Sequence, residues 1–565
     1  MLKILYSIFL SFLFFGLKAQ DPMLFDKPEA QQSSLFASAS SDKDAQITFS
    51  KTKPSTIQDQ QTSANRQLPT TNFKGPIQTE SGLVTGYYNN NSSVTVFKGI
   101  PFAAPPIGDL RWKAPQPAKP WKGIKECISF GPSPMQPKPV SFLMIGPEFV
   151  VPQQPLSEDC LYLNVWTAAK SANEKRPVMI WIYGGGFQTG GSAAAGYSGE
   201  ALALQGIIFV SFNYRLGIFG FLAHPDLTAE SDHHSSGNYA LMDMIAAINW
   251  VKKNIRAFGG DPDRITIAGQ SAGSASVNCL LASPPARGLF QGAIGESGSF
   301  VLENPILHMN SLAVAEKDGL RIANKLNASD LKTLRAIPAD ELQKSAGGFF
   351  APIVDGYILP ETVADTYKKN QQTHVPLLTG WNGDEGFVFG ISSKEDFAKQ
   401  AVAFGADSSL FRKYFPSSSD SESVASQIAL AVDKTIAISQ YQWALKQNAS
   451  GKPNTFLYVF TRKPPATGDK KKFGAYHTAE IGYALHTLDS IRRDWEPVDR
   501  RLEKLMSAYW VQFVKTGNPN QPGLPVWGSF SDQAPHSMIF GDSSTARLLP
   551  NKEALDFLYK SYPGK

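Results

Sequence analysis

The sequence predicts an α/β fold, with a large central β-sheet that is mostly parallel and is covered by helices on both faces. Short apolar stretches of strand length alternate with helical stretches from about Asn72 to Tyr562, which is the pattern of a helix-covered parallel sheet. Neither an internal repeat nor a second linker divides this region of the sequence. We therefore expect a single domain over residues 71–565.

Local patterns of apolar residues predict the strands and the clearest helix. The helix is expected at Asn238–Phe258, where apolar side chains recur at helical spacing and Gly259-Gly-Asp-Pro262 stops it. Each expected strand is a short and strongly apolar run. The expected strands are Val178–Tyr183, Ile207–Asn213, Arg264–Ala268, Val375–Gly380 and Thr455–Phe460.

Composition and charge argue against several classes of protein. The chain has 565 residues, of which 42% are hydrophobic and 18% charged, so it can fill a large core and is neither disordered nor collagen-like. The net charge is +5 and the basic residues are scattered along the chain, so we expect no nucleic-acid partner. The sequence has no His pair or Cys/His cluster with ligand spacing and no nucleotide fingerprint, so no metal and no cofactor are expected.

The N-terminus predicts an export signal followed by a flexible leader. Residues 4–17 are almost entirely apolar, and a helix of about 14 residues spans about 21 Å, less than the ~30 Å hydrocarbon core of a membrane. We expect a signal peptide over residues 1–19, cut near Ala19, with an uncleaved anchor helix as the alternative. Residues 20–70 are rich in small polar residues and are expected to be flexible. The mature protein would be secreted or periplasmic, with no membrane span.

A nucleophile motif follows the strand expected at Arg264–Ala268. Gly269-Gln-Ser271-Ala-Gly273 joins this strand to a helix expected at Ser274–Ala282, which is the nucleophile-elbow arrangement. The sharp turn lifts the hydroxyl of Ser271 clear of the sheet, and the glycines let neighbouring backbone approach. The helix directs N–H groups and the positive end of its dipole toward a developing oxyanion. An ordinary strand-to-helix turn is the alternative, because so short a pattern also arises by chance.

A run of three glycines supplies candidate donors for that oxyanion. The strand that ends at Tyr183 runs into Gly184-Gly-Gly-Phe187, at the strand end where open α/β sheets bind their ligands. We expect the N–H groups of Gly185, Gly186 and Ala272 to hold a tetrahedral intermediate. Each such donor typically contributes about 3–4 kcal/mol to transition-state stabilisation. A flexible glycine loop is the alternative when this segment is considered alone.

Together with several further stretches, these motifs resemble the type-B carboxylesterases, the family that includes the cholinesterases. The resemblance extends from about residue 75 to 550. It implies an α/β-hydrolase fold whose long sheet is antiparallel at its edges, a gorge-like active site, and a small-molecule ester as the substrate of an acyl-enzyme mechanism. The matching stretches are Phe97–Pro106, Ser157–Val165, Gly184–Gly186, Asn213–Phe221, Gly259–Pro262 and Gly269–Gly273.

The resemblance also assigns the partners of Ser271. In this family the acid is the second acidic residue of an Asp-Glu-Gly turn, here Glu385, and the histidine begins a His-x-x-Glu-Ile stretch, here His477. From the residues alone, Asp384 competes with Glu385 and His486 competes with His477. His477 would take the proton of Ser271 and deliver it to the leaving alcohol. Glu385 would fix the imidazole tautomer and stabilise the imidazolium.

One disulfide is expected among the three cysteines. Export favours oxidation, and Cys279 lies in an apolar run that is typical of a buried helix. Cys127 and Cys160 remain as the candidate pair, and the resemblance points to the same bridge. Closing the loop between them would stabilise the fold by roughly 3–4 kcal/mol.

Three departures from the cholinesterase pattern concern the substrate pocket. Gln270 precedes the nucleophile where cholinesterases carry Glu, and residues 127–160 contain no Trp for cation–π contact with a quaternary ammonium group. We therefore expect poor binding of choline esters. Residues 345–348 read Ser-Ala-Gly-Gly where cholinesterases narrow the acyl pocket with aromatics, which predicts a wider pocket. The candidate pocket residues are Gln270, Phe187, Phe349 and Phe350.

Two other functions are compatible with the same scaffold. A non-catalytic adhesion or binding protein would lack the nucleophile or its partners, whereas this chain retains Ser271, Glu385, His477 and the glycine run. A hydrolase of amides, carbamates or lactones would keep the same residues. We place carboxylic esters first, and the sequence carries no signal for the oligomeric state.

Overall fold

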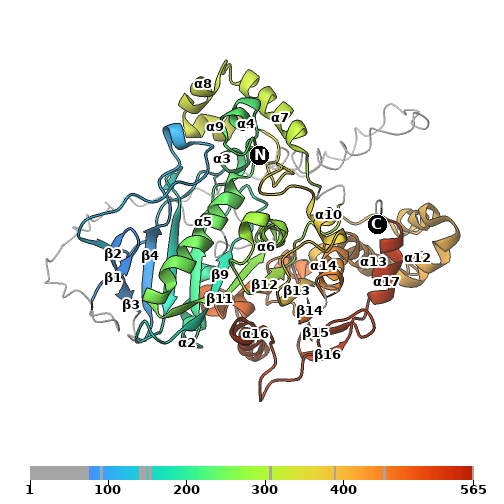
Figure 1. Cartoon of the computed structure of the whole chain (residues 1–565). Helices are drawn as coiled ribbons and strands as arrows, with labels where there is room; N and C mark the ends of the chain where they lie inside the picture. Colours follow the sequence, from blue (N-terminus) through green and yellow to red (C-terminus); the bar gives the residue numbers. More distant parts are fainter. Residues whose placement is uncertain are drawn as a thin grey trace, which may run out of the picture. The chain divides into compact units, whose positions relative to one another are not determined.

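The computed structural model describes residues 75–89, 93–138, 149, 155–303, 308–345, 347–386, 390–448 and 454–562. The expected signal peptide (1–19) and leader (20–70) lie outside these residues. Eleven strands form the central sheet (Figure 1). In spatial order they are β16 (Thr545–Leu548), β15 (His536–Phe540), β14 (Thr455–Phe460), β13 (Leu377–Asn382), β12 (Gly292–Glu296), β11 (Gly260–Gln270), β9 (Arg176–Ile182), β10 (Ile208–Phe212), β8 (Tyr162–Thr167), β4 (Thr95–Pro101) and β3 (Tyr87–Tyr88).

The sheet is parallel in its centre and antiparallel at both edges. All neighbouring strands from β10 to β15 pair in parallel. The pair β15–β16 at one edge and the pairs from β10 through β8 and β4 to β3 at the other are antiparallel. This arrangement confirms the predicted fold class. Two small sheets lie outside it, β1 (Ile77–Thr79) with β2 (Gly82–Thr85) and β5 (Ile124–Glu126), and β6 (Ser133–Pro134) with β7 (Leu156–Ser157).

All five strands expected from the sequence form, as β9, β10, β11, β13 and β14. The other six strands of the central sheet (β3, β4, β8, β12, β15 and β16) were not among the expected ones, and β12 is the one that lies between the expected strands β11 and β13. Its sequence, Gly-Ala-Ile-Gly-Glu, carries two glycines and ends in a charged residue, and glycine and charge are both unfavourable in a strand judged locally. Its five residues are nevertheless all buried, because the neighbouring strands and helices enclose it.

Helices follow most of the parallel strands. The helix expected at 238–258 forms as α5, and a 3₁₀ turn at Ile255–Phe258 continues it to Gly259, whose φ of 86° ends it. None of the described helices combines the length and apolarity needed to cross a membrane. The helices are α2 (Glu200–Leu204), α3 (Gly217–Phe221), α4 (Pro225–Glu230), α5 (Tyr239–Asn254), α6 (Ala272–Ala282), α7 (Leu312–Lys325), α8 (Leu331–Ala336), α9 (Ala339–Ser345), α10 (Val363–Lys368), α11 (Lys394–Lys399), α12 (Ser408–Tyr414), α13 (Asp420–Val432), α14 (Ile438–Asn448), α15 (Ile481–Ala484), α16 (Pro497–Thr516) and α17 (Lys552–Lys560).

Two successive residues of β12 show that helices cover both faces of the sheet. A Cβ on Gly295 would lie 2.3 Å from the Trp443 ring of α14 and 2.9 Å from the Ser274 hydroxyl of α6. The next residue, Glu296, accepts a hydrogen bond from Trp510 Nε1 of α16 at 2.7 Å. Because successive side chains of a strand point to opposite faces, α6 and α14 lie on one face and α16 lies on the other.

The predicted bridge between Cys127 and Cys160 is wrong in this structure, in which all three cysteines are free and buried. The carbonyl of Cys127 accepts a hydrogen bond from Lys98 N–H at 2.8 Å, whereas the carbonyl of Leu161, next to Cys160, accepts one from Phe102 N–H at 3.2 Å. Lys98 and Phe102 are four residues apart, which is roughly 10–13 Å along an extended chain. A disulfide requires Cα atoms within about 7 Å of each other.

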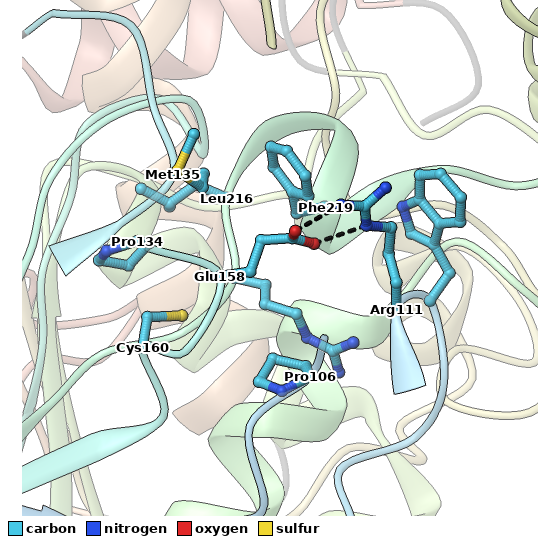
Figure 2. Close-up of a pocket in the computed structure, with 10 residues that line it drawn as sticks. Pro106, Arg111, Pro134, Met135, Glu158, Cys160, Leu216 and Phe219 are labelled. Atoms are coloured by element: carbon cyan, nitrogen blue, oxygen red, sulfur yellow. Dashed lines mark hydrogen bonds and ion pairs between the residues drawn. The ribbon is translucent and has the colours of Figure 1, made fainter. Parts of the chain in front are cut away.

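Cys160 instead borders a small pocket beside Pro134 and Met135 (Figure 2). The pocket has a volume of about 10 Å³, which is about the space that one water occupies. Figure 2 also shows the bidentate ion pair between Arg111 and Glu158 on its wall, with N···O distances of 2.6 and 2.5 Å. Arg111 Nη1 also donates to two backbone carbonyls at the end of α8, at 2.8 and 2.6 Å. Arg111 therefore links Glu158, in the segment between β7 and β8, to the C-terminal end of α8.

Candidate active site

The turn between β11 and α6 holds Ser271 in a strained conformation. Its φ is 57° and its ψ is −124°, a sparsely populated region that costs a non-glycine residue about 1–3 kcal/mol. The backbone around it offsets this cost: Ser271 N–H donates to the Glu296 carbonyl at 2.8 Å, and Ala275 N–H donates to the Ser271 carbonyl at 2.9 Å. The turn is thus held by β12 on one side and by the first turn of α6 on the other.

Three glycines allow the backbone to pack tightly enough for this turn. A Cβ on Gly273 would lie 2.0 Å from the Ile182 carbonyl oxygen, and a Cβ on Gly269 would lie 2.6 Å from the Gly273 carbonyl. A Cβ on Gly298 would lie 2.2 Å from the carbonyl oxygen of Ser271. Each distance is well below van der Waals contact, so a larger residue at any of these positions would displace the turn that holds Ser271. The sequence motif predicted the first two glycines and missed Gly298.

Ser271, His477 and Glu385 form a continuous chain of hydrogen bonds. His477 Nε2 lies 2.8 Å from Ser271 Oγ, and His477 Nδ1 lies 2.5 Å from Glu385 Oε2. The Glu385 side chain is fully buried, whereas the His477 side chain is 31% exposed. This is the geometry of a nucleophile with its general base and orienting acid, and it brings together three residues that lie far apart in the sequence.

The structure also shows why the neighbouring candidates do not fill these positions. Asp384 lies beside the loop that carries His477, and its Oδ2 accepts a hydrogen bond from Ala475 N–H at 2.7 Å. His486 Nδ1 lies 2.9 Å from the hydroxyl of Ser507 in α16. Asp384 therefore holds the loop that carries His477, and His486 packs elsewhere in the domain.

Two residues without a predicted role fix the orientation of Glu385. The hydroxyl of Ser297 donates to Glu385 Oε1 at 2.7 Å, and the backbone N–H of Asn382 donates to the same oxygen at 2.5 Å. The side-chain amide of Asn382 donates in turn to the Tyr476 carbonyl at 2.7 Å and to Glu480 Oε2 at 2.5 Å. Glu480 is the glutamate of the His-x-x-Glu-Ile stretch, and Asn382 lies two residues before the Asp-Glu-Gly turn, but neither motif shows what these residues contact.

Two further carboxyl groups lie buried near His477 and Glu385. Burial raises the pKa of Glu296 to about 8. Burial, and then the nearby carboxyl groups of Glu296 and Glu385, raises the pKa of Glu480 well above its ordinary value. One oxygen of Glu296 and one of Glu480 have no hydrogen-bond partner among the described residues. Burial thus favours the neutral, protonated form of both groups and limits the negative charge that they place near His477.

The glycine loop after β9 packs directly against the nucleophile turn. A Cβ on Gly184 would lie 2.6 Å from the Gln270 carbonyl and 2.9 Å from Ser271 Cβ. Gly185 and Gly186 have φ values of 118° and 62°, which glycine adopts without strain. The N–H groups of Gly185, Gly186 and Ala272 donate no hydrogen bond to another described residue. Donors in this position remain available to an oxyanion beside Ser271.

The four candidate pocket residues occupy two different environments. Phe187 and Gln270 are each 2% exposed, so they lie behind the site. Phe349 is 45% exposed, and its ring lies 3.9 Å from the position that a Cβ on Gly186 would take. It therefore borders the glycine loop Gly184–Gly186. The carbonyl of Phe350 accepts a hydrogen bond from Gln188 Nε2 at 2.5 Å, which ties this segment to the glycine loop.

No group of three or more His, Cys, Asp or Glu side chains is placed to hold a metal ion in the part of the chain that the structure describes. The reactive groups found there are a hydroxyl, an imidazole, carboxyl groups and backbone amides. This set can carry out nucleophilic acyl transfer with proton exchange at the imidazole.

Comparison with known proteins supplies an independent line of evidence. The family model described as "Carboxylesterase family" matches residues 74–558. A fumonisin B1 esterase of Sphingopyxis macrogoltabida is 36% identical, over 82% of this chain and 86% of the relative, and a para-nitrobenzyl esterase of Bacillus subtilis is 32% identical, over 86% and 98%. A crystal structure of a Geobacillus stearothermophilus carboxylesterase is similar with a TM-score of 0.73 at 30% identity, covering 86% of this chain and 99% of that one.

The buried carboxyl of Glu296 predicts a pH dependence of stability. Its pKa is about 8 in the folded protein against 4.5 ordinarily, so folding takes up a proton between these values. The stabilisation is fully present below about pH 4.5 and is lost as the pH rises through about 8, on the order of a few kcal/mol. We expect the free energy of unfolding, measured with denaturant at pH 5 and pH 8.5, to fall less in Glu296→Gln than in the wild type. The control is Glu341→Gln, which removes an exposed carboxyl group. An equal fall in the free energy of unfolding in all three proteins would contradict the raised pKa of Glu296.

Proposed function

The chain belongs to the carboxylesterase family and is a carboxylic ester hydrolase, and we propose that Ser271, His477 and Glu385 perform the hydrolysis through a covalent acyl-enzyme. The observation that carries this proposal is the unbroken chain of hydrogen bonds from Ser271 Oγ through the imidazole to Glu385. It supplies a nucleophile, a base whose Nε2 lies 2.8 Å from the oxygen of the hydroxyl to be deprotonated, and an acid that fixes the imidazole.

In the acylation step, Ser271 Oγ attacks the carbonyl carbon of the ester, and its proton passes to His477 Nε2. His477 Nδ1–H stays hydrogen-bonded to Glu385, which stabilises the imidazolium. The carbonyl oxygen becomes an oxyanion and accepts hydrogen bonds from the N–H groups of Gly185, Gly186 and Ala272. The tetrahedral intermediate then collapses as the bond to the alcohol oxygen breaks and the imidazolium protonates that oxygen. The alcohol leaves, and the acyl group stays on Ser271.

Deacylation repeats these steps with water as the nucleophile. Water loses a proton to His477 Nε2 and attacks the acyl carbon, and the same three N–H groups hold the second oxyanion. When the intermediate collapses, the imidazolium returns its proton to Ser271 Oγ and the carboxylic acid is released. The net reaction consumes one ester and one water and forms one acid and one alcohol, with no cofactor required.

The completeness of the site argues against the non-catalytic alternative. An adhesion protein on this scaffold does not need a base at 2.8 Å from the serine hydroxyl, nor a buried acid that receives two further hydrogen bonds. Amides, carbamates and lactones remain possible additional substrates of the same acyl-enzyme chemistry. We rank esters first, because an alcohol is a better leaving group than an amine.

We further propose a wide acyl pocket and export from the cell. Phe349 is exposed beside the glycine loop, and small residues precede it in the sequence. Both features favour a pocket wide enough for bulky acyl groups. The absence of a Trp from residues 127–160 and of a carboxylate at position 270 disfavours choline esters. The apolar residues 4–17 support a cleaved signal peptide and a secreted or periplasmic enzyme.

Replacing the nucleophile tests the proposed mechanism. We expect Ser271→Ala to lower kcat for an aryl ester by about 10⁴–10⁶, because the three residues act as one unit. The control is Ser283→Ala at the far end of α6, whose buried hydroxyl has no hydrogen-bond partner among the described residues. This variant should keep the wild-type kcat. The loss of activity in Ser271→Ala could then not be ascribed to the removal of a serine hydroxyl in general. Retention of more than a tenth of wild-type activity in Ser271→Ala would refute the assignment.

A series of p-nitrophenyl esters with acyl groups from acetyl to benzoyl tests the width of the pocket. We expect kcat/KM for butanoyl and benzoyl esters to equal or exceed the value for acetyl. Phe349→Trp should lower kcat/KM for benzoyl by about 10-fold and leave acetyl nearly unchanged, because a methylene-scale change in pocket fit is worth about 1–3 kcal/mol. The panel also includes a choline ester, expected to be a poor substrate, and fumonisin B1, named in one relative. A sharp preference for acetyl would contradict the wide pocket.

A further inference from the structure

The side chain of Gln270 contacts two segments at once: the loop that carries His477 and the glycine loop Gly184–Gly186. It precedes the nucleophile at the end of β11 and is 2% exposed, so it does not face the substrate. Its Nε2 donates a hydrogen bond of 2.5 Å to the carbonyl oxygen of His477. Its Oε1 would lie 3.2 Å from a Cβ on Gly184, which shows that the other end of the amide packs against the glycine loop.

The loop that carries His477 depends on a small number of such ties. The N–H of Ala475 is bonded to Asp384, and the carbonyl of Tyr476 is bonded to the side-chain amide of Asn382. Both ties act on residues that precede the histidine. Among the described residues, Gln270 supplies the hydrogen bond found on the backbone carbonyl of His477 itself. Releasing this carbonyl would leave the peptide plane free to rotate and would carry the imidazole with it.

We propose that Gln270 is a positioning residue of the ester hydrolysis, and that its neutral amide sets the backbone of His477 so that Nε2 meets the hydroxyl of Ser271. This inference rests on the proposed roles of Ser271 and His477. A carbonyl can accept a hydrogen bond only from a donor. An amide donates at every pH, whereas a glutamate in the same place would donate only when protonated and would otherwise face the carbonyl oxygen with a like partial charge.

The charge at position 270 matters because the site already contains several acidic groups. Acid and phenol groups face this region from β12, from the loops after β13 and β14, from β14 itself and from the 3₁₀ turn Ala195–Tyr197, and two cations lie at its edge. Burial raises the pKa of Glu296 and of Glu480 and so favours their neutral forms, and a charged imidazole is balanced by the Glu385 carboxyl group that it contacts. The groups in question are Glu296, Asp384, Glu385, Glu480, Tyr197, Tyr458 and Tyr476, with Lys463 and Arg493.

Adding a carboxylate at position 270 would disturb this balance. A second negative charge close to the imidazole favours its charged form, and a protonated imidazole cannot accept the proton of Ser271. The acid limb of the profile of kcat/KM against pH reports this protonation in the free enzyme. A carboxylate at 270 would therefore move that limb to higher pH, while an apolar side chain of the same length would not.

The experiment compares Gln270→Met with Gln270→Glu. Met has the length of Gln without a donor or a charge, and Glu has its shape without a permanent donor. We measure kcat, KM and kcat/KM from pH 5 to 9 for an aryl ester, with each rate divided by the concentration of sites titrated with an organophosphonate. Gln270→Met should lower kcat about 10-fold at every pH, the effect of one lost buried hydrogen bond, with KM within about twofold and the acid limb unmoved. Gln270→Glu should lower kcat further above neutrality and shift the acid limb upward by about one pH unit or more.

The outcomes separate positioning from a role in folding or in substrate contact. Wild-type kcat per titrated site in both variants, with only a lower Tm, would overturn the proposal, since Gln270 would then be merely structural. A change in KM alone would overturn it as well, because it would place Gln270 against the substrate. An unmoved acid limb in Gln270→Glu would contradict the charge argument. Activity that survives in Ser271→Ala would instead refute the proposed role of Ser271, so the two failures can be told apart.

Discussion

The hydrogen bond between His477 Nε2 and Ser271 Oγ is the contact on which the rest of the site depends, and the order of the strands makes it possible. β11, β12, β13 and β14 are neighbours and run in parallel, so the segments that follow them emerge at the same edge of the sheet. Ser271 follows β11, Ser297 follows β12, Glu385 follows β13 and His477 follows β14. Each successive strand thus contributes one member of the hydrogen-bonded chain, and the sheet fixes their spacing.

Strain and close packing keep that contact in place. The nucleophile turn adopts an unfavourable φ and is held there because glycines at 184, 269, 273 and 298 let backbone approach where any Cβ would collide. The buried acid is oriented by Ser297 and Asn382, and the histidine loop by Asp384, Asn382 and Gln270. The groups to which we assign the reaction are therefore held in position without substrate, which is the condition for electrostatic stabilisation of the transition state.

The parts of the fold that could be predicted from the sequence are those with strong local patterns. β9, β11 and β14 are apolar runs with clear boundaries, whereas β12 contains two glycines and a glutamate, and its burial arises from tertiary packing. The cysteine prediction failed because sequence spacing does not show that the Cys127 carbonyl accepts a hydrogen bond from Lys98 N–H, whereas the residue after Cys160 accepts one from Phe102 N–H, four residues further along. The choice between Asp384 and Glu385 required the resemblance, since adjacent residues of a turn point in different directions. The sequence gives no sign that the Gln270 amide turns back to the carbonyl of His477.

Mapping the site of an irreversible aryl phosphonate tests the central contact most directly. Phosphonylation requires a nucleophile that gives its proton to a base, so mass spectrometry of the digested adduct should locate the label on Ser271. His477→Ala should remain unlabelled over the time in which the wild type reacts to completion. A label on any other residue, or equal labelling rates in the wild type and His477→Ala, would contradict the account.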